Sequence, residues 1–288
     1  MTVENELVRV GTTVFQNRSE MLFLPEYCMP EHINTTIPTE ADLFTQSISQ
    51  KYPIGAQLLK DGNLWRYCKA GAAMAAYGFL KCSYYQVPGK AGNSATSGFE
   101  GAFYAAVTAG DTSFQIADTA ATKNLYAGAR LLVYDDTNVA GQQYRVIGND
   151  ATDATSTTCY IASPGFKYDT ATSVGITIYL NPYQNVRNCA DGGGYASAIG
   201  AARLSVTSGY YFWLTTAGPV SCLTGASTWP GQTQYQRDVF CNTDGSIITG
   251  ASGTTELYQR IGYLLGRTAS DYGDNFVMLQ LDTLGGAF

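Results

Sequence analysis

Few side chains in this sequence are of the kind that catalyses reactions. The only histidine, His32, lies in the proline-flanked stretch "MPEHINTTIP", and a Ser-His-Asp or Cys-His enzyme would have to use it as its base. Such a stretch offers no preorganised pocket, so the pattern favours a solvated or interface histidine. No G-x-S-x-G, H-E-x-x-H or P-loop motif occurs. We therefore predict a protein that is not an enzyme and carries no cofactor.

Paired carboxylates raise two further possibilities, glycoside hydrolysis and cation binding. Asp135-Asp136 follow the apolar run "ARLLVY", where a β-turn is expected because Asp side chains bond to their own backbone. The stretches "NDATD" (149–153) and "DYGD" (271–274) lack the density of oxygen ligands found in calcium loops. The glycine run "DGGGY" (191–195) has no strand-to-helix context for phosphate binding. We predict no metal site.

The seven cysteines are odd in number and widely spaced, without a Cys-x-x-Cys pair. That spacing does not predict a zinc site. We expect free thiols that act as small buried residues in a protein made in a reducing compartment.

The composition favours strands over helices and argues against two classes of partner. Charged residues make up 14% of the chain, against about 25% in ordinary domains, whereas Gly (31) and Tyr (21) are abundant. Strands and tight turns use such residues, but helices need Leu, Glu, Lys and Arg. The net charge of −6 and the scattered basic residues argue against nucleic acid. The chain has no apolar run that could span a bilayer and no secretory signal, so we predict no membrane contact and assembly in a cytoplasm.

Residues 1–52 are expected to form an extended arm, because they contain prolines, apolar residues without a clean period, and no hairpin turn. A short helix is predicted in "TEADLFTQSIS" (39–49), with Thr39 as its N-cap and Asp42 completing a capping box. The arm cannot bury its own apolar side chains. We expect it to pack either on the body of its own chain or on a neighbouring subunit.

The rest of the chain is punctuated by turns. Residues 53–101 hold a β-hairpin that turns at Asp61-Gly62 and then a polar linker, and we expect them to pack with the C-terminal domain. Residues 102–185 form a middle domain of short strands, and residues 186–288 a C-terminal β domain with strands that include "ARLSVT" and "GYYFWLT". We predict a mostly β protein of antiparallel β-barrel or sandwich modules with an extended N-terminal arm.

The stretch "SGYYFWLTTAGPVSCLTG" (208–225) places four aromatic residues in succession. Side chains of a strand alternate between its faces, so Tyr211 and Trp213 share one face and both faces need cover. Three interpretations stay open: a central strand of a core, a subunit interface, or a platform on which sugar rings stack. The candidate interface residues from this strand and from the arm are Phe15, Leu22, Phe23, Leu24, Tyr211 and Trp213.

Together with this stretch, "GAQLLKDGNLWRYCKAG", "YAGARLLVYDDTNVAGQQYRVIG" and "QRIGYLLGRTASDYGDNFVMLQLD" resemble virion structural proteins of tailed bacteriophages. The closest likeness is to capsid decoration (cement) proteins. In that group a Gly-aromatic-x-Trp strand leads into a Gly-Pro turn, and a later strand carries an Ile-Gly pair. The counterparts here are Gly209–Trp213, Gly218-Pro219 and Ile261-Gly262. The likeness covers residues 53–69 and 102–285, and the middle block makes this chain longer than compact decoration proteins.

The resemblance implies a non-enzymatic capsid decoration protein that binds and stabilises the outer face of a phage head. Its partner would be the major capsid protein of the same phage, and its location the surface of the virion. Repeated shells favour closed symmetric assemblies, so we expect a homo-oligomer, with a trimer favoured. The alternatives are a glycan-binding receptor or a tail-fibre or head-fibre module, and a hydrolase, which the single histidine disfavours.

Overall fold

The computed structural model describes residues 7–10, 12–17, 19–25, 27, 34, 36–74, 78–84, 92–93, 98–134, 141–192, 196–224, 237–249, 258–266 and 275–283 of the chain. Within these ranges the chain forms two antiparallel sheets, the short α-helix α1 (Glu40–Leu43) and the 3-10 helix η2 (Cys189–Gly192). The prediction of a mostly β, antiparallel protein with little helix is confirmed. No helix in the described ranges is long and apolar enough to cross a membrane.

The larger sheet has thirteen strands, which pair along the path β1-β2-β3-β4-β5-β16-β20-β19-β17-β18, with β6, β14 and β15 attached beside it. Their bounds are β1 (Leu7–Val10), β2 (Thr12–Asn17), β3 (Glu20–Leu24), β4 (Gln57–Lys60), β5 (Asn63–Lys69), β6 (Leu80–Ser83), β14 (Val186–Asn188), β15 (Ser197–Ala201), β16 (Tyr211–Cys222), β17 (Asp238–Cys241), β18 (Ile247–Ile248), β19 (Arg260–Leu264) and β20 (Asn275–Gln280). The first strand, β1, and the last, β20, therefore belong to one sheet.

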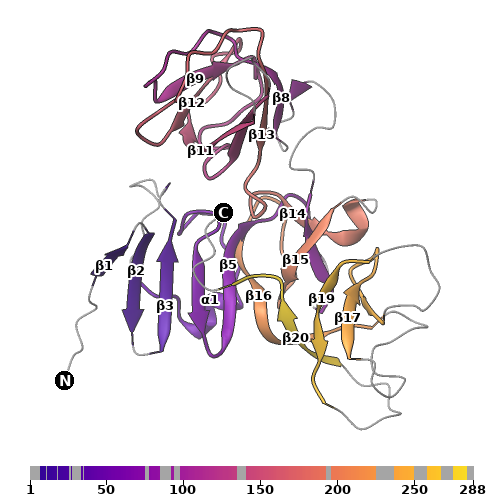
Figure 1. Ribbon diagram of the computed structural model, residues 1–288. Coiled ribbons are helices and arrows are strands. Elements are labelled where there is room, and N and C mark those ends of the chain that lie inside the picture. The colour runs from indigo at the N-terminus through magenta and orange to yellow at the C-terminus, as the bar shows by residue number, and fades with distance from the viewer. Residues whose placement is uncertain are drawn as a thin grey trace.

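The smaller sheet is a half-barrel in the order β7-β8-β13-β10-β11-β12-β9, and Figure 1 shows it as a separate lobe above the larger sheet. Its strands are β7 (Gly92–Asn93), β8 (Phe99–Ala102), β9 (Ser113–Ile116), β10 (Arg130–Val133), β11 (Gln142–Asn149), β12 (Thr157–Ile161) and β13 (Gly175–Tyr179). A bridge between Phe103 and Ile116 brings the chain after β8 back to β9, so the sheet curls around its own core. In that core the rings of Phe103, Phe114 and Phe166 pack edge to face.

Two local predictions are confirmed in detail. Asp61 and Gly62 both adopt positive φ, 51° and 74°, and join β4 to β5 with Lys60 opposite Asn63. Thr39 caps α1: its side chain accepts from the backbone N–H of Asp42, and the Asp42 carboxylate accepts from the backbone N–H of Thr39. The helix is only four residues long, shorter than the stretch from which it was predicted.

The N-terminal segment packs on the body of its own chain, which is one of the two placements expected. It does so as paired strands: β1, β2 and β3 form an antiparallel meander, and Leu22 of β3 lies opposite Leu58 of β4. The expectation that this segment contains no hairpin is therefore wrong. The β2–β3 turn has no Asn-Gly or Asp-Gly signal, and the strands are held instead by alternate side chains such as Leu22 and Leu24, which are buried in the core.

Two features of the C-terminal part differ from the prediction. The stretch "ARLSVT" (202–207) is not a strand, since β15 precedes it and only an isolated bridge joins Val206 to Met74. Gly218-Pro219 make no turn, because β16 runs through them to Cys222 as one twelve-residue strand. At this point the partner of β16 changes: pairing with β5 ends at Ala217, and pairing with β20 continues to Cys222. Gly218 has φ 101°, and a Cβ there would lie 2.6 Å from the carbonyl oxygen of Gly62.

Several predicted features lie outside the described residues, among them His32, Cys28, Asp135-Asp136 and "DYGD" (271–274). The stretch "NDATD" (149–153) lies within the described residues. The Asp153 carboxylate accepts from the backbone N–H groups of Thr155 and Ser156. The Thr155 hydroxyl also donates to this carboxylate; that bond has the largest effect, and together the three bonds lower the pKa of Asp153. The carboxylate therefore stabilises the turn that contains it.

Candidate functional site

The aromatic strand β16 is covered on both faces by its own chain. Trp213 is 2% exposed, and its ring packs against Tyr52 and Tyr67, with ring centroids 5.3 and 5.2 Å away. Tyr67 lies directly across from Trp213 on β5, and its ring stacks on Tyr211. On the opposite face, Phe212 is buried as well. These contacts agree with the first of the three interpretations of this stretch, a central strand of a core.

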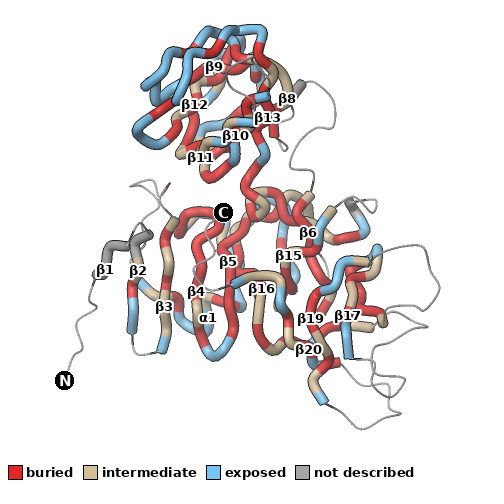
Figure 2. The backbone as a smooth tube through the Cα atoms, viewed as in Figure 1, coloured by how far each residue is buried: buried red, intermediate tan, exposed pale blue. Residues whose placement is uncertain are grey.

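Tyr52 covers the face of the sheet on which Tyr67 and Trp213 lie. It comes from the segment between α1 and β4, and its hydroxyl donates to the carbonyl oxygen of Thr36 at 2.7 Å. The neighbouring backbone N–H of Lys51 donates to the Tyr67 hydroxyl at 3.0 Å. Burial raises the pKa of Tyr52 to about 12, so the phenol stays neutral. Figure 2 shows the buried positions that run through β4 and β5 at the centre of this sheet.

The six predicted interface residues fall into two groups. Phe15, Leu22, Leu24 and Trp213 are buried within the single chain. Phe23 and Tyr211 are half-buried, so part of each side chain stays accessible. Phe23 lies on the outer face of β3, and Tyr211 lies at the first position of β16.

Two of the residues that carry the resemblance to decoration proteins meet at β20, whereas Gly209–Trp213 lead into the part of β16 that pairs with β5. Gly218 of β16 and Gly262 of β19 both pair with Leu279, from opposite sides of β20. A Cβ on Gly262 would lie 2.0 Å from the carbonyl oxygen of Met278, and its φ is 155°. Glycine is therefore required where β19 approaches β20.

Tyr27 joins the larger sheet to the half-barrel. Its hydroxyl donates to the carbonyl oxygen of Ile54 at 2.8 Å and accepts from Asn181 Nδ2 at 2.8 Å. The guanidinium of Arg145, from β11, lies 5.9 Å from the centre of the tyrosine ring. Burial raises the pKa of Tyr27 to about 12, which keeps the hydroxyl protonated as a donor. No sequence motif marks this residue, because its partners come from three distant segments.

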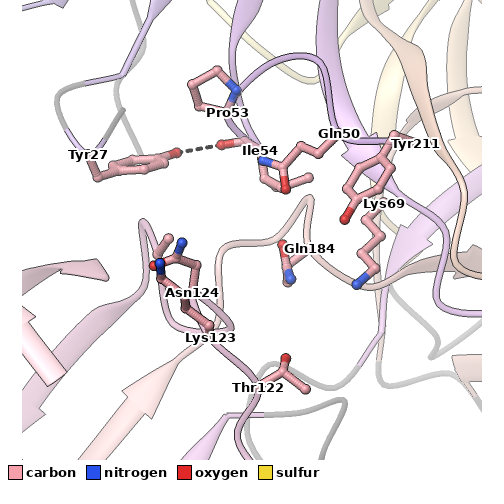
Figure 3. Close-up of a pocket in the computed structure, with 11 residues that line it drawn as sticks. Tyr27, Gln50, Pro53, Ile54, Lys69, Thr122, Lys123, Asn124, Gln184 and Tyr211 are labelled. Atoms are coloured by element: carbon pink, nitrogen blue, oxygen red, sulfur yellow. Dashed lines mark hydrogen bonds between the residues drawn. The ribbon is translucent and has the colours of Figure 1, made fainter. Parts of the chain in front are cut away.

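A pocket of about 300 Å³ opens beside Tyr27, between the two lobes (Figure 3). The larger sheet and its loops contribute Gln50, Lys69 and Tyr211, the half-barrel contributes Lys123, and Gln184 comes from the chain between the lobes. None of the eleven described residues that line the pocket is acidic. Two lysines and no acidic residue therefore line this recess, in a chain whose net charge is −6.

Lys69 is the unusual member of this lining. Burial lowers the pKa of its amine, and within the described chain the amine makes no ion pair. It lies 5.7 Å from the centre of the Tyr211 ring. Two more deeply buried cations of the larger sheet have carboxylate partners: Lys60 pairs with Glu20 at 2.6 Å, and Arg66 pairs with Asp282 at 2.6 Å. A third, Lys81, donates to Asn188 Oδ1 at 2.9 Å. The aromatic pattern of the sequence marks Tyr211, whereas no motif marks Lys69 or the pocket.

The chain matches no protein-family model, no curated protein and no solved structure. Its chemistry must therefore be argued from its own side chains. Among the described residues, no three of His, Cys, Asp and Glu gather closely enough to hold a metal ion. The six described cysteines are free and buried, and Sγ of Cys189 lies 3.9 Å from Sγ of Cys241.

Proposed function

We propose that this protein is a non-enzymatic structural protein of a tailed-phage virion, which binds and stabilises the outer face of the head through the major capsid protein. The resemblance to decoration proteins supports this function.

One observation carries the proposal further, an outward apolar face on β2–β4. Val14, Met21, Phe23 and Leu59 are half-buried on this face, whereas the alternate residues Leu22 and Leu24 fill the core. Val14 pairs with Phe23 and Met21 pairs with Leu59, and we call these four residues the N-terminal apolar face. Two polar residues share it, Gln16 opposite Met21 and Gln57 opposite Phe23. A sheet with one wet face normally carries polar residues there, and an apolar surface of this kind is typical of a binding site.

The capsid is the occupant that fits this face. An extended apolar patch on paired strands can lie flat against a shell, and each copy of a repeated shell offers the same contact.

The chain itself is expected to be a homo-oligomer, with a trimer favoured. Sedimentation velocity at several protein concentrations measures that state, and a monomer at high concentration would contradict it.

Binding to heads tests the function. Purified protein is mixed with heads of the source phage that lack it, and co-sedimentation is compared for the natural chain, Phe23→Lys and Phe276→Lys. Phe276 is 50% exposed on β20, away from the N-terminal apolar face, so it is the matched control. We expect Phe23→Lys to reduce binding strongly and Phe276→Lys to leave it unchanged. Absence of the natural chain from the head pellet, with all variants folded by circular dichroism, would refute the proposal.

A further inference from the structure

We propose that the pocket between the two lobes binds a carboxylated sugar, with Lys69 pairing with the carboxylate and Thr122, Gln184 and Tyr211 bonding to the hydroxyl groups. This site is separate from the N-terminal apolar face and would give the protein a second binding activity.

The charge of the pocket indicates an anion. Lys69 has lost part of its hydration without gaining a carboxylate within the described chain, a state that disfavours its charged form. Lys123 brings a second amine to the same lining, which has no acidic member. A bound carboxylate would supply to Lys69 what Glu20 supplies to Lys60. A neutral ligand would bring no negative charge to the Lys69 amine.

The remaining polar groups indicate hydroxyls. The side chains of Gln184, Tyr211 and Thr122 line the pocket and make no hydrogen bond with the described chain. Figure 3 shows the Tyr211 hydroxyl, the Lys69 amine and the Gln184 amide around a common space. An amide and a hydroxyl can each donate and accept, as sugar hydroxyls do, whereas a bare carboxylate only accepts. A ligand that uses the whole lining must carry both kinds of group.

The pocket has the size and rigidity that a small ligand requires. Its volume of about 300 Å³ is at the lower end of the range for small-molecule sites, which suits one sugar unit. One wall is fixed by Asn149, whose Nδ2 donates to the carbonyl oxygen of Thr122 at 2.9 Å. The opposite wall is fixed by Asn181, whose Nδ2 donates to the carbonyl oxygen of Ile54 at 3.2 Å. A preformed site loses little entropy when the ligand binds.

Isothermal titration calorimetry of the full chain tests the proposal with four probes: galacturonate, galactose, acetate and inorganic phosphate. We expect galacturonate to bind about tenfold more tightly than any of the other three, because only it offers a carboxylate and hydroxyls together. Acetate or phosphate binding as tightly as galacturonate would overturn the sugar assignment and indicate a general anion site, open also to an acidic side chain of a partner protein. No heat from galacturonate at millimolar concentration would overturn the site.

Three variants assign the binding to the pocket. Lys69→Gln should weaken galacturonate binding by about tenfold or more, since it removes a charge-assisted bond. Lys167→Gln, which removes the same charge from the exposed surface of the half-barrel, should bind like the natural chain. Tyr211→Phe keeps the ring and loses only the hydroxyl, so it should weaken binding by a few-fold. Equal binding by Lys69→Gln and Lys167→Gln would overturn the proposal. If Lys69→Gln does not fold, unchanged binding by Tyr211→Phe overturns the role of the hydroxyl-bonding groups.

Discussion

Asp282 forms a buried ion pair whose removal should destabilise the larger sheet more than any surface substitution. Its carboxylate accepts from Arg66 Nε at 2.6 Å and from Arg66 Nη2 at 3.0 Å, a bidentate pair in which the two side chains are 5% and 3% exposed. Gln57 Nε2 and the Thr216 hydroxyl donate to the same carboxylate. The pair ties the segment after β20 to β5, across 216 residues of sequence.

The expected cost follows from this burial. Asp282→Asn keeps the shape but leaves the Arg66 charge without its anion, and breaking a buried pair in this way costs about 3–5 kcal/mol of unfolding free energy. Arg66 keeps its bond from Nη1 to the carbonyl oxygen of Gly55 and its place over the Tyr183 ring, and neither supplies a negative charge. The matched control is Asp238→Asn. Asp238 pairs with Arg260 Nε at 2.8 Å, but those side chains are 61% and 49% exposed, so its loss should cost about 0–1 kcal/mol.

Urea unfolding at pH 7, followed by tryptophan fluorescence, measures both costs, because Trp65 and Trp213 lie in the larger sheet. Combining Arg66→Met with Asp282→Leu should cost less than the sum of the single changes, because no buried charge then stays unpaired. A loss below about 1 kcal/mol for Asp282→Asn, or equal losses for Asp282→Asn and Asp238→Asn, would refute the reasoning.

Three further predictions concern the glycine contact, alkaline pH and the thiols. Gly262→Ala should lower the melting temperature by several degrees, since its Cβ meets the Met278 carbonyl, whereas Gly266→Ala, which meets nothing within 4 Å, should leave it nearly unchanged. The raised pKa of Tyr27, about 12, stabilises the fold below pH 10, and this contribution to the free energy of unfolding should be lost between pH 10 and 12 at about 1.4 kcal/mol per pH unit. Tyr27→Phe should therefore reduce the slope of the unfolding free energy against pH in alkaline urea titrations. An unchanged slope would contradict the assignment. Thiol titration of the unfolded, unreduced protein should find all seven cysteines free. Oxidised glutathione, itself reduced to two thiols, should first join Cys189 to one of its two thiol neighbours, Cys241 or Cys82, and peptide mapping that first finds a pair without Cys189 would contradict the geometry.

The features that could be predicted from the sequence are those whose causes lie within a few residues. Asp61-Gly62 predicts its hairpin because both residues adopt positive φ at little cost, and Thr39 predicts a helix start because its side chain reaches the N–H three residues on. Alternating patterns such as "GITIY" predict strands, and in β13 Ile176 and Ile178 are indeed buried. The N-terminal meander was missed because its turns lack such a signal.

What the tertiary structure alone decided depends on contacts between distant segments. Gly218-Pro219 would make a turn in isolation, but β5 and β20 on either side hold them in one strand. Whether Trp213 faces a neighbouring subunit or its own core was undetermined until Tyr52 and Tyr67 were seen to cover it. The pocket and the Arg66–Asp282 pair likewise join residues far apart in the chain. Turn and cap preferences act locally, whereas the pairing of distant strands depends on the summed burial of many side chains, and no single segment of the sequence records that sum.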